Sequence, residues 1–139
     1  MRFRVRKSAH VLERVGLAMA GAACGLFVSA HVGSTISFLT SQGFLLLMML
    51  AGAVGFYLGI DTPQKPFHGD PDDPAGGIDL AEFLSAVGTF LATLTAFFSV
   101  GIIILRSEPH IALTVLIGIG WTIGIVMQIV AGAIARVRA

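Results

Sequence analysis

The stretch LAEFLSAVGTFLATLTAFFSVGIIIL, Leu80 to Leu105, decides the fold class of this chain. A helix crosses a bilayer with about 20 apolar residues, because the hydrocarbon core is roughly 30 Å thick and each residue rises about 1.5 Å. Within this stretch the only charged residue is Glu82, near its start. The stretch therefore predicts a transmembrane helix.

Other parts of the chain have the same character. Of its 139 residues 55% are hydrophobic and 12% are charged, and so much apolar surface cannot be buried inside a soluble fold of this size. Four spans are predicted, at about residues 15–32, 43–60, 80–105 and 111–135. We predict an all-α protein, a single domain over residues 1–139 formed by a bundle of four antiparallel transmembrane helices.

The distribution of Lys and Arg predicts the orientation, because loops rich in these residues stay in the cytoplasm. With four spans, the N-terminus, the 61–79 connector and the C-terminus share one side. That side carries Arg2, Arg4, Arg6, Lys7, Arg14, Lys65, Arg136 and Arg138, and the other side carries Arg106. We predict cytoplasmic termini in a multi-pass protein of a bacterial inner (plasma) membrane, with the RFRVRK segment at the inner surface.

An alternative reading of the N-terminus is a secretory signal peptide. A basic start followed by an apolar run ending in VSA fits such a signal, with cleavage after Ala30. Cleavage there would leave an odd number of spans, so we favour a first transmembrane helix.

The connector contains the acidic stretch GDPDDPAGGIDLAEF, Gly69 to Phe83. It partly matches the calcium loop of EF-hands, but counting back from Glu82 places Pro71 and Ala75 at two ligand positions. Asp79 instead suits the N-cap of the next helix, with Glu82 three residues later as in a capping box. We predict a connector and a helix cap.

The polar residues inside the predicted spans are neutral, and no Asp, Glu, Lys or Arg lies near the middle of any span. Coupled transporters usually place ionisable groups there, so the sequence disfavours that class. A polar line of Ser85, Thr89 and Thr93, together with Gln128, is a candidate pore lining or a set of helix contacts.

The charge and the motifs of the chain exclude other classes of function. A net charge of +1 gives no basic field for binding nucleic acid. No catalytic or nucleotide-binding motif occurs, so we predict no enzyme and no cofactor.

Small residues recur at four-residue spacing, which allows helix backbones to approach closely in lipid. The predicted packing positions are Gly21, Gly25, Gly55, Gly59, Gly120, Gly124 and Gly132. They could face another helix of the same chain or another subunit.

Two histidines are predicted at the outer ends of spans. His31, Glu108 and His110 are weak candidates for a metal site, because nothing in their spacing ensures that they converge; interfacial hydrogen bonding is the alternative.

From these features we predict a small non-enzymatic membrane protein, an accessory or scaffolding subunit in a homo-oligomer or a larger membrane complex. The alternative is a homo-oligomeric channel or facilitator lined by the polar face of the helix over 80–105.

Overall fold

A computed structural model of the chain describes residues 2–59 and 80–138, with side chains for residues 7–59 and 80–137. The described residues are all-helical apart from short links. The helices are α1 (Arg2–Thr35), the 3-10 turn η1 (Ser37–Leu39), α2 (Gln42–Gly59), α3 (Leu80–Ile104) and α4 (Ile111–Arg138). The 61–79 connector and the predicted Asp79 cap lie outside the described residues.

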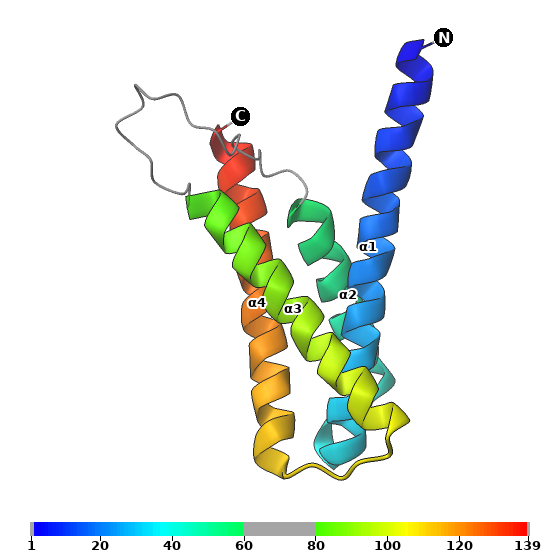
Figure 1. Cartoon of the computed structure of the whole chain (residues 1–139), viewed down its shortest axis with the longest axis vertical. Coiled ribbons are helices and arrows are strands. Elements are labelled where there is room, and N and C mark those ends of the chain that lie inside the picture. Colours follow the sequence, from blue (N-terminus) through cyan, green and yellow to red (C-terminus); the bar gives the residue numbers. More distant parts are fainter. Residues whose placement is uncertain (1, 60–79, 139) are drawn as a thin grey trace.

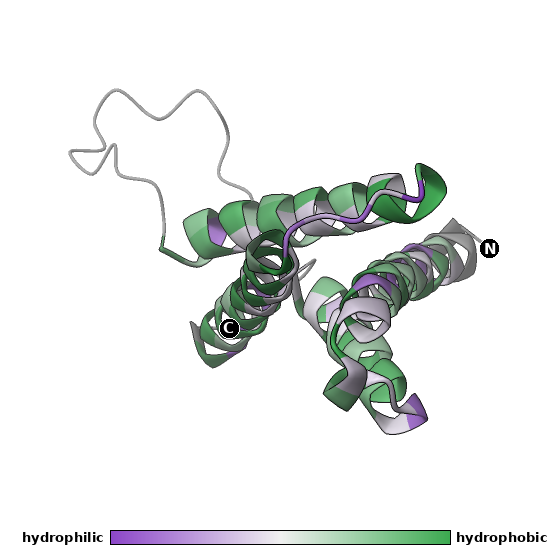
Figure 2. Ribbon diagram, turned by 90° about the horizontal axis from the view of Figure 1, so that it is seen from below, coloured by the Kyte–Doolittle hydropathy of each residue, from purple (hydrophilic) through white to green (hydrophobic). Residues whose placement is uncertain are grey.

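Four of these helices are long and apolar enough to cross a membrane, over Lys7–Thr35, Gln42–Gly59, Leu80–Ile104 and Ile111–Val137. They form a bundle in which short links join α1 to α2 and α3 to α4 at one end (Figure 1). Figure 2 shows that the helices are mostly hydrophobic and that the link before α4 is hydrophilic. These properties indicate a multi-pass membrane protein.

Polar side chains fix the starts of two helices. Ser41 Oγ accepts a hydrogen bond from the Phe44 N–H at 3.2 Å, which makes Ser41 the N-cap of α2. At α4 the corresponding residue is His110, whose Nδ1 accepts from the Ala112 N–H at 3.2 Å. Each contact satisfies one of the N–H groups that a helix start leaves without a partner.

Within the bundle, α1 packs mainly on α2, and α3 packs mainly on α4. In the first pair, a methyl group added at Gly21 would collide with the Gly52 carbonyl, and one at Gly25 would collide with that of Met48. In the second pair, a methyl at Gly88 would lie 2.6 Å from the Gly124 oxygen. The backbones therefore touch where glycine leaves room, as expected of helices that pack in lipid.

The remaining predicted packing glycines also face neighbouring helices of the same chain. Gly55 faces Gln128 and Ile125, Gly59 lies near Ser85 and Gln128, Gly120 lies against Thr95, and Gly132 lies against Leu58. All seven predicted positions thus have close neighbours inside this chain.

The core lies along one face of α4. Thr114, Trp121 and Gln128 are spaced seven residues apart and are 0%, 2% and 1% exposed. Seven residues make nearly two turns, so the three side chains point the same way. Around them pack the buried apolar residues Val28, Val32, Met48, Phe56, Ala92, Ala96, Ile117 and Ile125.

Candidate functional site

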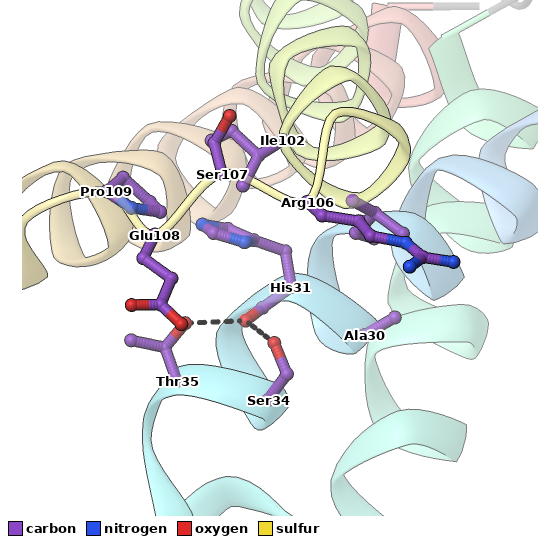
Figure 3. A pocket seen from close by; sticks show the side chains of 10 residues that line it. Ala30, His31, Ser34, Thr35, Ile102, Arg106, Ser107, Glu108 and Pro109 are labelled. Carbon is purple, nitrogen blue, oxygen red and sulfur yellow. Dashed lines mark hydrogen bonds between the residues drawn. The ribbon is translucent and has the colours of Figure 1, made fainter.

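A pocket of about 580 Å³ opens at the end of the bundle where α1 ends and the α3–α4 link begins. We call it the outer pocket after the predicted orientation of the chain; Figure 3 shows side chains that line it, which are both apolar and polar. Its lining residues are Ala30, His31, Ser34, Thr35, Ile102, Ile103, Arg106, Ser107, Glu108 and Pro109.

His31 forms the base of the outer pocket and is 2% exposed. Its Nε2 lies 3.2 Å from the Thr114 hydroxyl, a contact that joins α1 to α4 across 83 positions of sequence. The backbone carbonyl of His31 accepts hydrogen bonds from the Ser34 and Thr35 hydroxyls at 2.8 and 3.1 Å (Figure 3). These bonds satisfy a carbonyl near the end of α1 and hold the last turn in place.

Arg106 occupies an unusual backbone position at the edge of the outer pocket. The N–H of Arg106 bonds to the Ile103 carbonyl at 3.3 Å, and the N–H of Ser107 bonds to that of Ile102 at 3.1 Å. This is the Schellman pattern, which requires a left-handed residue where glycine is usual. Arg106 adopts it with φ of 48°, at a cost of about 1 kcal/mol for a residue with a side chain.

The two charged side chains of the outer pocket point to different sides. In the view of Figure 3 the Arg106 guanidinium extends toward the side of Ala30, the Glu108 carboxylate extends toward the opposite side, and the His31 ring is drawn between them. Neither charge takes part in an ion pair in the described part of the chain. The pocket therefore offers a separate cation and anion to a ligand.

The metal candidates do not gather into one site. His31 and Glu108 both line the outer pocket, whereas the Nδ1 of His110 is occupied by the backbone of α4. Among the residues that the structure describes, no three His, Cys, Asp or Glu side chains form a group that could hold a metal ion.

The polar line of α3 divides between the interior and the surface. Ser85 donates to the Gly59 carbonyl at 3.3 Å, and Thr89 accepts from Gln128 Nε2 at 2.8 Å. Thr93 is exposed and donates to the carbonyl of Thr89 in its own helix at 2.8 Å. Positions four residues apart drift by about 40° around a helix, so the line rotates away from the core.

Two polar atoms of the α4 core face have no hydrogen-bond partner within the described residues, Trp121 Nε1 and Gln128 Oε1. Trp121 packs beside Gly52 of α2, where an added methyl would lie 3.3 Å from the ring. Trp121 was not among the predicted site residues. Its position seven residues from both Thr114 and Gln128 was the available signal.

Comparison of the chain with known protein families, characterised proteins and solved structures returned no match.

Proposed function

We propose that the chain is a non-enzymatic integral membrane protein, an accessory or scaffolding subunit of an oligomer or a larger complex. In this proposal the four spans are antiparallel, both termini are cytoplasmic, and the membrane is a bacterial inner membrane. The Lys and Arg residues near the two chain ends, to which the connector adds Lys65, support that orientation.

The proposal rests on the N-terminal half of α1, which extends beyond its contact with α2. Arg14 Nη1 lies 3.5 Å from the Tyr57 hydroxyl, and the guanidinium lies 5.5 Å from the centre of the Tyr57 ring. Tyrosine and arginine favour the membrane–water interface, so in the proposed orientation this pair lies at the cytoplasmic boundary. Helix α1 begins at Arg2, and twelve further residues extend it about 18 Å beyond that boundary.

The extension runs on as a straight continuation of α1, apart from the other helices (Figure 1). Near the boundary Leu12 is 71% exposed and Met19 is 67% exposed. Gly16 lies between them with no atom near the position of an added methyl. A basic extension above an uncovered apolar helix face suits contact with another membrane subunit.

The channel alternative has less support. A pore between subunits needs polar side chains on the outer surface of the bundle, and Ser85 and Thr89 are engaged within the chain. Thr93 and Thr122 are exposed, but each hydroxyl bonds to a carbonyl of its own helix. Such hydroxyls are compatible with lipid contact.

Photocrosslinking in native membranes tests the proposal. A photoreactive residue at Leu12 or Met19 should capture a defined neighbour, either a second copy or another subunit. The same residue at Leu116 of α4, which is 64% exposed, is the matched control and should capture lipid alone. Absence of any protein adduct from α1, together with a monodisperse monomer in mild detergent, would contradict the proposal. Solute flux in proteoliposomes would favour the channel.

A further inference from the structure

The outer pocket combines three properties that a lipid headgroup site needs. Its volume of about 580 Å³ falls in the range of roughly 300–1,000 Å³ that is typical of ligand pockets. It lies where the helices end, and Ile102 and Ile103 form part of its wall. Next to this wall Ile104 and Leu105 are 71% and 76% exposed, which provides an apolar surface for acyl chains.

The polar rim has donors and acceptors for a ligand with two charges. The Arg106 guanidinium can donate two parallel hydrogen bonds to phosphate oxygens. The Glu108 carboxylate can accept from an ammonium group. These two charges lie on opposite sides of His31 and do not neutralise each other (Figure 3).

We propose that the outer pocket binds the headgroup of a phospholipid that carries a phosphate and a primary ammonium group, as phosphatidylethanolamine does. Arg106 binds the phosphate and Glu108 binds the ammonium. His31, held by Thr114 at 3.2 Å, fixes the base of the pocket. The acyl chains lie along the exposed isoleucines at the end of α3.

The left-handed backbone of Arg106 supports this assignment. Glycine would fit the Schellman position without strain, and arginine instead places a cation at the rim of the pocket. The site is independent of the surface of α1 on which the proposed subunit contact rests, so each proposal can fail without the other.

Native mass spectrometry of the full chain, released from detergent micelles that contain phosphatidylethanolamine, phosphatidylcholine and phosphatidylglycerol in equal amounts, tests the assignment. Phosphatidylethanolamine should be retained in preference to phosphatidylcholine, whose quaternary ammonium has no N–H. It should also be retained in preference to phosphatidylglycerol, which has no ammonium. Arg106→Gln should weaken retention of phosphatidylethanolamine and phosphatidylglycerol alike. Glu108→Gln should reduce only the preference for phosphatidylethanolamine, by about threefold, within the range of an exposed ion pair.

Lys7→Gln and Glu13→Gln make the same charge changes on α1 at the far end of the bundle and should leave the lipid preference unchanged. Arg106→Gly removes the cation and the backbone strain together, so it tests the cation in a chain that folds. Equal retention of the three lipids by the wild type would overturn the proposal. So would wild-type retention in both Arg106 variants, or a wild-type preference in Glu108→Gln. A thermal shift by soluble phosphoethanolamine as large as that by the lipid would also overturn it, because the occupant would then be water-soluble.

Discussion

Replacing Gly88 with Ala is a direct test of the close contact between α3 and α4. The added methyl would lie 2.6 Å from the Gly124 oxygen and 3.0 Å from the Gln128 nitrogen, whereas ordinary contact begins near 3.4 Å. Both neighbours are backbone atoms, which cannot rotate away as a side chain can. The two helices must therefore separate by about 0.8 Å, which forfeits a quarter to a half of the dispersion energy of each atom pair that parts.

The expected magnitude follows from two opposing contributions. Alanine is favoured over glycine in a helix by about 1 kcal/mol, and overpacking costs about 1–3 kcal/mol. Because the contacts are with backbone, we expect the upper part of that range and a net loss of about 1–2 kcal/mol of unfolding free energy. Gly101 of the same helix has no atom within 4 Å of an added methyl, so Gly101→Ala should gain about 0.5–1 kcal/mol.

The measurement is equilibrium unfolding in mixed micelles, followed by the fluorescence of Trp121, the single tryptophan of the chain. The two alanine variants should move the unfolding midpoint in opposite directions. If Gly88→Ala proves as stable as Gly101→Ala, the backbones of α3 and α4 do not touch as described, and the account of the packing is wrong.

Further predictions concern single contacts. In a double-mutant cycle, Gln128→Met and Thr89→Val should each destabilise the fold by about 1 kcal/mol, because each leaves one partner of the 2.8 Å hydrogen bond unsatisfied. The double variant should lose less stability than the sum of the two single variants. Strict additivity would show that the hydrogen bond contributes nothing. Arg106→Gly should raise the unfolding free energy by about 0.5–1 kcal/mol by removing left-handed strain, and a lower melting temperature would argue against that strain. Thr114→Val should destabilise by about 1 kcal/mol through loss of the contact with buried His31; unchanged thermal melts would refute a contribution from this contact.

Hydropathy was enough to predict the helical class and the four apolar segments, because a membrane span is a local property of about 20 residues. The predicted first span begins at Val15, whereas α1 begins at Arg2. Charged residues in the first turns of a helix are unfavourable in lipid but are no obstacle to a helix in water. A search for spans therefore finds the membrane part of such a helix and misses its extension.

The partners of individual residues could not be predicted in the same way. Glycine spacing marks a helix face but does not say which helix covers it, and Gly21 and Gly55 pack on different neighbours. The contact between His31 and Thr114 joins residues 83 positions apart, and no local pattern encodes it. The left-handed conformation of Arg106 could not be predicted, because a helix that ends in this way usually has glycine at that position. The outer pocket depends on both of these features.

The face of α4 that carries Thr114, Trp121 and Gln128 has a consequence for biosynthesis. Together these residues reach all three other helices: Thr114 contacts His31 of α1, Trp121 lies against Gly52 of α2, and Gln128 bonds to Thr89 of α3. The first two helices can pack through Gly21 and Gly52 before the rest of the chain is made, but α3 packs mainly on α4 and has fewer contacts with α1 and α2. We expect the nascent bundle to stay loosely assembled until its last span enters the membrane. Chains arrested before Ile111 should then be cleaved by protease faster than the complete chain, and equal protection of the two would contradict this order.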